Sequence, residues 1–200
     1  ILTFDYPVQI NDMEQLADFT IRFVEQMKIK NPLFIGASLG GLLAQLIMRK
    51  YPNGDAAYGL YSTSALSASA VKDLMKQYKS YGVMLALMKI VPYSWIRKIL
   101  INVSKKMIGV ENEAEQDRKY MEDFFEWVYR NYTKEFDIHM TTLMVSIAKI
   151  KPITEQEYKK ADKNVLLVLP TDDKAFSEAA KNELISHLPN AMVTMVTGGH

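Results

Sequence analysis

One serine in this chain of 200 residues stands in a setting that could make it a nucleophile. Ser38 lies in the pentapeptide Gly36-Ala37-Ser38-Leu39-Gly40, with a glycine two positions before it and another two positions after it. A hydroxyl acts as a nucleophile when its oxygen is exposed and close to both a base and hydrogen-bond donors for the oxyanion that forms. A sharp strand-to-helix turn exposes the oxygen, and the tightness of that turn requires glycine at the flanking positions. The pentapeptide therefore predicts a nucleophile elbow with Ser38 at its tip.

The segments on either side of Ser38 fit such a turn. Residues 33–35 form a short apolar run that predicts a buried strand, and from Leu39 apolar residues recur at helical spacing. The first N–H groups of a helix have no partner within it and lie at its positive dipole end. We therefore expect the Leu39 N–H to be one oxyanion donor. The alternative interpretation is that the small residues only allow tight packing of a strand and a helix.

The rest of the chain predicts an α/β fold with a mostly parallel sheet. Strands alternate with helices on both sides of Ser38, an order that implies parallel strands. Between residues 62 and 160, by contrast, only helical patterns occur. We expect a core made of residues 1–61 and 161–200, with a helical insertion over residues 62–160. The expected strands are residues 1–6, 33–35, 58–61, 164–170 and 191–196, and the expected core helices are residues 11–27, 39–51 and 177–187.

Composition narrows the classes of function. The chain has no cysteine, which excludes disulfides, thiolate nucleophiles and thiolate metal sites. The formal net charge of +1 provides no overall field that would recruit nucleic acid. No apolar run approaches the roughly 20 residues that span a bilayer. We expect a soluble, cytoplasmic protein that needs no metal or organic cofactor.

Three segments together resemble the α/β-hydrolase superfamily: FIGASLGGLLAQLIMRKYP at residues 34–52, PTDD at 170–173 and GGH at 198–200. The resemblance covers about half of the chain and leaves the insertion unmatched. It implies that Ser38 is the nucleophile, that an acid follows the next-to-last core strand, and that a histidine follows the last. Asp173 fits the acid position and Asp172 is the near alternative, although either could simply form an Asx turn. His200 fits the general base, which the acid would orient.

The other two histidines have simpler explanations. His139 lies in the helical insertion, and His187 lies near a helix end, where the dipole favours a partly charged imidazole. Against His200 stands its place at the end of the chain after two glycines, where residues are often frayed. The order serine, aspartate, histidine along the chain favours the catalytic interpretation.

The chain also departs from the pattern of this superfamily. If residues 1–6 are its fourth strand, the first three strands are absent, which leaves a gap between residues 1–6 and the nucleophile strand. The loop that carries the second oxyanion donor would be absent with them. We expect the 200 residues to be part of a longer protein, or a companion segment to fill the gap.

In this superfamily an insertion at the position of residues 62–160 acts as a cap over the active site. From Lys72 to Lys106 it holds eight basic residues against the single acid Asp73, interleaved with apolar and aromatic residues. One interpretation is a lid that contacts an anionic membrane surface or a lipid-like substrate. The other is a helix pair with solvated lysines and a buried apolar side.

Two functions follow from these observations. The first is a serine hydrolase that cleaves an ester or related acyl bond of a small or lipid-like substrate through an acyl-enzyme. The second is a non-catalytic binding or scaffold protein that keeps the same fold, because fold alone does not fix function.

Overall fold

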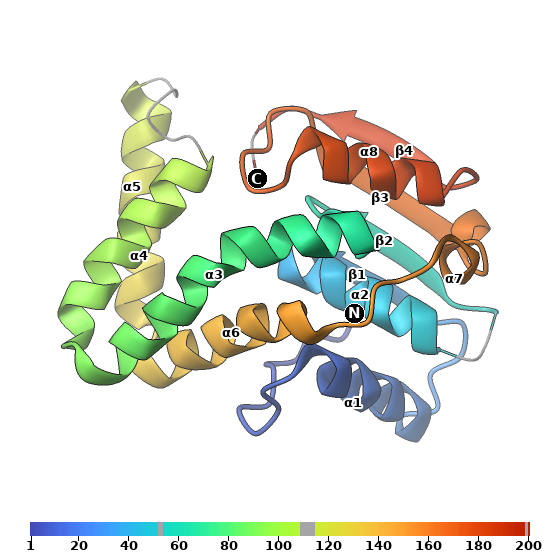
Figure 1. Cartoon of the computed structure of the whole chain (residues 1–200), viewed down its shortest axis with the longest axis horizontal. Helices are drawn as coiled ribbons and strands as arrows, with labels where there is room; N and C mark the ends of the chain where they lie inside the picture. Colours follow the sequence, from blue (N-terminus) through green and yellow to red (C-terminus); the bar gives the residue numbers. More distant parts are fainter. Residues whose placement is uncertain (52–53, 109–114, 199) are drawn as a thin grey trace.

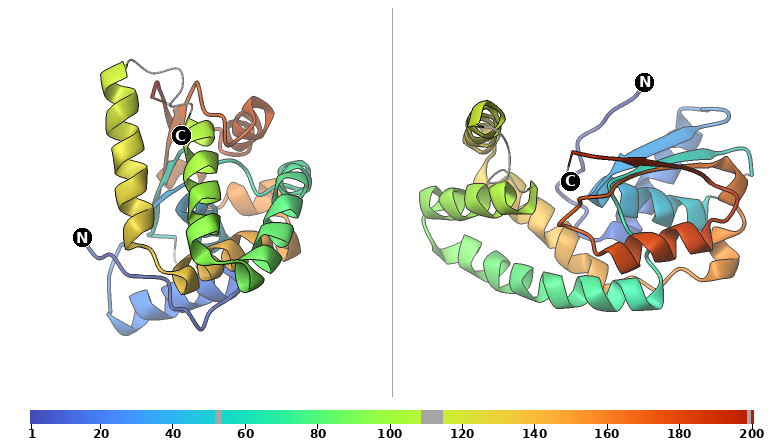
Figure 2. Two further views of the ribbon diagram at one scale, coloured as in Figure 1. Left: turned by 90° about the vertical axis from the view of Figure 1, so that its left-hand side faces the viewer. Right: turned by 90° about the horizontal axis from the view of Figure 1, so that it is seen from above.

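The computed structural model describes residues 1–51, 54–108, 115–198 and 200 of the chain. Its strands form one sheet in the order β1-β2-β3-β4, and every neighbouring pair is parallel (Figure 1). The predicted α/β class with a parallel sheet is therefore confirmed. Helices α2 and α8 lie on the same side of the sheet (Figure 2). The elements that build this core are β1 (Leu33–Ala37), β2 (Ala57–Tyr61), β3 (Val165–Pro170), β4 (Met192–Val196), α1 (Met13–Gln26), α2 (Leu39–Lys50) and α8 (Glu178–His187).

The prediction of a buried strand at residues 1–6 is wrong. The structure contains no strand there, and residues 1–5 are exposed. The backbone N–H and C=O groups of a strand need hydrogen-bond partners on a neighbouring strand, and among the described residues β1 pairs with β2 alone. No strand of the described chain pairs with the other edge of β1, where Leu33 and Ile35 are 59% and 66% exposed. A cavity of about 560 Å³ lies beside this edge, lined by residues of the 1–6 segment, α1, β1 and α2.

The long connection between β2 and β3 is helical, as its periodicity predicts, and holds no strand among its described residues. Helices α3 and α6 contact each other closely, and α4 and α5 form a second pair at the side of the molecule away from β3 and β4 (Figure 1). None of the described helices is both long and apolar enough to cross a membrane. The helices of this region are α3 (Ala68–Ile90), α4 (Tyr93–Ile108), α5 (Glu115–Asn131), α6 (Lys134–Ser146) and the short α7 (Glu155–Tyr158).

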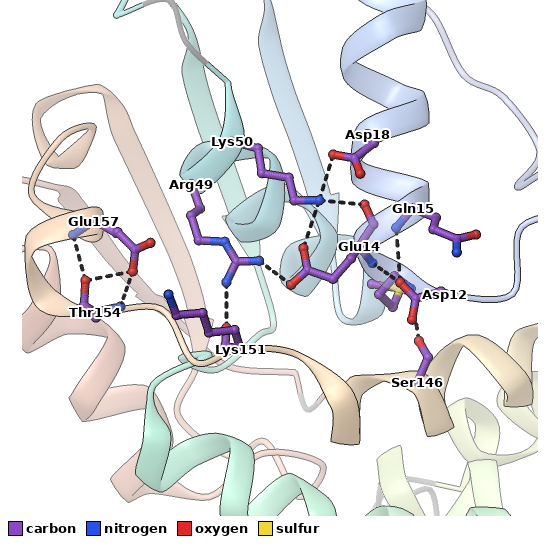
Figure 3. Close-up of polar contacts among 11 residues, drawn as sticks. Asp12, Glu14, Gln15, Asp18, Arg49, Lys50, Ser146, Lys151, Thr154 and Glu157 are labelled. Carbon is purple, nitrogen blue, oxygen red and sulfur yellow. Dashed lines mark hydrogen bonds and ion pairs between the residues drawn. The ribbon is translucent and has the colours of Figure 1, made fainter.

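Ion pairs connect α1 with the C-terminal turn of α2 (Figure 3). The Arg49 guanidinium bonds the Glu14 carboxylate, and the Lys50 ammonium lies 3.0 Å from Glu14 and 2.7 Å from Asp18. Burial by itself would raise the pKa of Glu14, but Arg49 and Lys50 hold that pKa below its ordinary value. Arg49 also donates to the Lys151 carbonyl at 2.6 Å. One helix end thus joins α1, α2 and the chain that follows α6.

A buried polar network lies behind the helix that follows Ser38. The Gln45 side chain is fully buried and donates to the Gly41 and Ser64 carbonyls at 3.1 and 2.9 Å. The Tyr158 hydroxyl donates to Gln45 Oε1 at 2.7 Å and accepts from the Leu66 N–H at 2.8 Å. Every polar atom named here has a partner, which buried polar groups require. The network fixes α2 relative to the segment that leaves β2.

We expect Tyr158→Phe to destabilise the protein by about 1–3 kcal/mol, because it leaves the buried Leu66 N–H and one oxygen of Gln45 without partners. Urea unfolding followed by circular dichroism would measure the change. The matched control is Tyr120→Phe, since Tyr120 is an exposed residue of α5 and its loss of a hydroxyl should change stability by less than about 0.5 kcal/mol. Equal stability of Tyr158→Phe and the wild type would contradict this account of the network.

Candidate active site

Ser38 lies at a tight turn between β1 and α2, and its backbone takes a left-handed conformation with φ of 52° and ψ of −116°. Such a conformation costs a non-glycine residue about 1–3 kcal/mol and persists only where the surroundings enforce it. The Ser38 N–H donates to the Tyr61 carbonyl at 3.0 Å, and the Thr63 hydroxyl donates to the Ser38 carbonyl at 3.2 Å. The end of β2 therefore holds the serine backbone in place from both sides.

Glycine makes this turn sterically feasible. A Cβ atom on Gly36 would lie 2.1 Å from the Gly40 carbonyl oxygen, which is backbone and has nowhere to move. A Cβ atom on Gly41 would lie 2.7 Å from the side chain of Thr63. Gly36 thus lets β1 and α2 approach each other closely, and Gly41 does the same for α2 and the segment that follows β2. The role that the pentapeptide predicts for its two glycines is thus met at Gly36. At Gly40 the prediction is wrong, because a Cβ atom there would lie no closer than 3.6 Å to a neighbouring atom, the Tyr6 hydroxyl oxygen.

The Leu39 N–H stands at the first position of α2, next to the serine. It donates to no atom of the described residues, whereas the Gly41 and Leu42 N–H groups both donate to the Ser38 carbonyl. A free N–H at a helix N-terminus favours negative charge nearby. The structure thus leaves the Leu39 N–H available, as the predicted oxyanion donor must be.

Asp173 follows β3 by a short turn, and its side chain is 0% exposed. Its Oδ1 accepts from the N–H groups of Ala175 and Phe176 at 2.7 and 3.2 Å, and its Oδ2 lies 3.0 Å from His200 Nδ1. Burial by itself would raise the pKa of Asp173, but the His200 imidazole and these backbone N–H groups lower that pKa below its ordinary value. The carboxyl group is thus kept ionised beside the histidine.

The His200 imidazole lies between the aspartate and the serine. Its Nε2 is 2.8 Å from Ser38 Oγ, and its Nδ1 is 3.0 Å from Asp173 Oδ2. The buried Phe176 ring packs against the imidazole with the two ring centres 5.4 Å apart. The side chain of His200 therefore contacts three neighbours, which the alternative of a frayed terminal residue does not predict.

The two aspartates that the sequence left as alternatives have different partners. Asp173 contacts His200, whereas both carboxylate oxygens of Asp172 lie 3.3 Å from the Gly198 N–H. Asp172 therefore holds the loop that leads to the histidine, and Thr171 extends the pairing of β3 with β4 by donating its N–H to the Val196 carbonyl at 2.9 Å. Gly199 of the GGH segment and Pro52 of the serine segment lie outside the described residues.

The other two histidines are not part of this arrangement. Neither His139 nor His187 forms a hydrogen bond with Ser38 or Asp173 in the described part of the chain. His139 is buried in α6, where burial lowers the pKa of its imidazole while the backbone of Tyr6 partly opposes that shift. The ring of His187 stacks on Tyr158 with the centroids 5.3 Å apart.

Several residues that support the site carry no signal in the sequence. Thr63 is completely buried beneath the elbow, and Gln45 is completely buried behind it. Lys181 of α8 is 1% exposed, and its ammonium donates to the Pro170 carbonyl at 2.6 Å and pairs with Glu178 at 3.0 Å. Each of these residues has a partner at least 11 positions away in the sequence, so only the fold reveals its role. These partners are Ser38 for Thr63, Ser64 for Gln45 and Pro170 for Lys181. No group of three or more His, Asp or Glu side chains that could hold a metal ion occurs among the described residues.

The strained backbone at Ser38 leads to a stability prediction. Ser38→Gly and Ser38→Ala both remove the hydroxyl, but only glycine adopts a positive φ without strain. We expect Ser38→Gly to be more stable than Ser38→Ala by about 1 kcal/mol, because part of the strain energy is offset by the greater freedom of glycine in the unfolded chain. Thermal or urea unfolding of the two variants would measure the difference, and a less stable glycine variant would show that the turn is unstrained.

The lowered pKa of Asp173 leads to a prediction about pH. A carboxyl group whose pKa is lower in the folded state stabilises the protein above its unfolded pKa of about 4, and this contribution disappears as the pH falls through the folded pKa. We expect the free energy of unfolding to fall less between pH 7 and pH 3 in Asp173→Asn than in the wild type. Urea titrations at both pH values measure it, and identical falls in the two proteins would contradict the prediction. Asparagine retains an acceptor for the Ala175 and Phe176 N–H groups, so it is a conservative replacement.

Only the comparison with solved structures identifies proteins similar to this chain. No known family model matches the sequence, and a search of characterised proteins finds no match. Among solved structures, the chain is similar to a carboxylesterase of Nitrososphaera gargenis, with a TM-score of 0.63 and 18% identity over 94% of this chain and 65% of that one. An enol-lactonase from Burkholderia xenovorans gives a TM-score of 0.64 and 15% identity over 92% of this chain and 64% of that one. A thermophilic esterase from Thermogutta terrifontis gives 0.62 and 14%, over 94% and 65%.

The similarity extends over nearly the whole chain but over only part of each neighbour. The chain spans less than two thirds of the length of these three proteins. At such low sequence identity the comparison shows a shared fold and nothing about activity. This fold agrees with the parallel sheet and the helical region described above. The chain has the α/β-hydrolase fold. It corresponds to part of that fold, with four parallel strands among the described residues and a set of helices between β2 and β3.

Proposed function

We propose that this chain carries the catalytic serine, histidine and aspartate of a serine hydrolase that cleaves an ester or related acyl bond. The observation that supports it most directly is the unbroken series of contacts from Ser38 Oγ to His200 Nε2, at 2.8 Å, and from His200 Nδ1 to Asp173 Oδ2, at 3.0 Å. Nucleophile, base and orienting acid within hydrogen-bond reach of one another are the requirement for nucleophilic catalysis by a hydroxyl.

In the proposed first half-reaction, Ser38 Oγ attacks the carbonyl carbon of the substrate while its proton passes to His200 Nε2. The ionised Asp173 carboxylate stabilises the imidazolium that results and holds the ring in the required tautomer. The Leu39 N–H donates to the oxyanion of the tetrahedral intermediate. When that intermediate collapses, the bond to the leaving alcohol breaks and His200 returns its proton to the alcohol oxygen. The product of this half-reaction is an acyl ester on Ser38.

In the second half-reaction water replaces the alcohol. His200 takes a proton from the water molecule as its oxygen attacks the acyl carbon, and then returns that proton to Ser38 Oγ as the acyl bond breaks. The free carboxylic acid leaves and the serine is restored. These steps use only side chains and backbone of this chain and need no metal or organic cofactor.

We also propose that residues 62–160 form a cap that contributes to binding a small or lipid-like acyl substrate. The support for this is positional, since α3, α4, α5 and α6 all leave the core after β2 and return before β3. The α4–α5 pair projects beside the C-terminal end of the chain, where His200 lies (Figure 1). Closure of helices over such a site would exclude water and add apolar contacts for an acyl group.

The proposal is tested with a fluorophosphonate probe, which phosphonylates an activated serine. We expect labelling at Ser38 in the wild type, none in Ser38→Ala, and labelling slower by about a thousandfold or more in His200→Ala, because the hydroxyl then has no base. Mass spectrometry of the labelled peptide identifies the modified residue, and circular dichroism confirms that each variant is folded.

Two matched variants accompany this test. Ser94→Ala removes an exposed serine of α4 and His187→Ala removes an imidazole outside the site, so both should be labelled like the wild type. Labelling that persists in Ser38→Ala, or that is unchanged in His200→Ala, would refute the hydrolase proposal. A folded protein with no labelling at Ser38 would instead favour a binding or scaffold role for this fold.

A further inference from the structure

Helix α4 exposes an apolar stripe on one of its faces. Trp95, Ile99 and Val103 follow one another at intervals of four residues and therefore lie on the same face of the helix. All three are exposed, with Trp95 68% and Ile99 41% exposed. Ile90, the last residue of α3, is also strongly exposed and lies only five residues before Trp95, across the Val91-Pro92 turn. Large apolar residues gathered in this way mark an interaction surface.

Other faces of the same helix hold it in place, so the exposed stripe is not left over from poor packing. Ile96 is 1% exposed, and the Tyr93 hydroxyl donates to the Asp137 carboxylate of α6. On the side facing α5, Ser104 forms a 2.8 Å hydrogen bond with Tyr129. Contacts with the rest of the protein therefore occupy the faces of α4 that do not carry the stripe.

The charged residues of α4 itself all have one sign. Helix α4 contains four basic residues and no acidic residue. Arg97 packs on Tyr93 and Lys105 pairs with Glu122 at 3.7 Å. Lys98 and Lys106, by contrast, are exposed and form no ion pair with any residue that the structure describes. Their free ammonium groups flank the apolar stripe, although the net charge of the whole chain is only +1.

We propose that this face of α4 docks on an anionic lipid surface. Trp95, Ile99 and Val103 would enter the boundary between headgroups and acyl chains, and Lys98 and Lys106 would contact the negatively charged headgroups. This combination of an apolar stripe that includes tryptophan with flanking lysines is what an interfacial helix requires. The corner of α3 and α4 lies on the side of the molecule away from β3 and β4, so α4 can approach a surface without the sheet in the way (Figures 1 and 2). This proposal rests on the residues of α4 and does not depend on the proposed hydrolase activity.

The chain has two tryptophans, which makes the test direct. Trp127→Phe leaves Trp95 as the only tryptophan, and Trp95→Phe leaves Trp127, a 64% exposed residue of α5, as the matched control. Vesicles of phosphatidylcholine with about 30% phosphatidylglycerol should shift the emission of Trp95 to shorter wavelength and reduce its quenching by acrylamide. The emission of Trp127 should not change. Equal shifts of both tryptophans, or no shift of Trp95, would overturn the proposal.

Co-sedimentation with the same vesicles tests the role of charge. We expect Lys98→Glu/Lys106→Glu to bind the vesicles at least about tenfold more weakly than the wild type, because each lysine near an anionic surface contributes to binding. We also expect binding of the wild type to fall as salt is added. The matched variant Lys30→Glu/Lys163→Glu has the same net charge but changes exposed lysines elsewhere, and it should bind like the wild type. Equal loss in the two double variants, or equal binding to vesicles of pure phosphatidylcholine, would overturn the proposal.

Ser38→Ala separates this surface from catalysis. The variant should bind vesicles as the wild type does, because Ser38 lies at the end of β1 and not on α4. If wild-type protein fails to bind any vesicle while it is labelled normally by the fluorophosphonate, the lipid surface is excluded and the hydrolase proposal stands. In that case a protein partner would be the occupant of the stripe.

Discussion

The turn at Ser38 is the constraint on which the rest of the site depends. A serine with a φ of 52° is unfavourable, yet in this conformation the Ser38 hydroxyl lies 2.8 Å from His200 Nε2. It exists because Gly36 lets the strand and the helix nearly touch, and because the end of β2 binds the serine backbone through Tyr61 and Thr63. The elbow is therefore a tertiary structure and not a property of the pentapeptide alone.

Parallel pairing brings the Asp173 and His200 side chains to the same edge of the sheet as Ser38. In a parallel sheet all strands end at one edge, so the segments after β1, β3 and β4 emerge together. Thr171 and Asp172 extend the contact between the last two of these segments by bonding Val196 and Gly198. The fully buried carboxylate of Asp173 then needs hydrogen-bond donors to stay ionised, and His200 with two backbone N–H groups supplies them.

Apolar side chains are buried in one part of the molecule and exposed in two others. Around α2 the core is tightly packed, since nearly all of that helix is buried between the sheet and α1. The edge of β1 and the stripe on α4, by contrast, expose large apolar side chains to solvent. The first lies beside a cavity next to the 1–6 segment, and the second is flanked by Lys98 and Lys106, which form no ion pair with the residues that the structure describes. Their different surroundings are why only the α4 stripe indicates a charged partner.

The sequence by itself determined the class of fold and predicted where the elbow lies, because both depend on local pattern: apolar runs, helical periodicity and glycines near the serine. It also determined the order of Ser38, Asp173 and His200 along the chain. It also limited the acid to two neighbouring aspartates. Only the tertiary structure showed that Asp173, and not Asp172, contacts the His200 imidazole, because this contact joins residues 27 positions apart. It likewise decided that residues 1–6 form no strand, since a strand-like sequence becomes a strand only where a neighbour accepts its hydrogen bonds. The support from Thr63, Gln45 and Tyr158 is invisible in the sequence for the same reason, because each acts through a partner that only folding brings near.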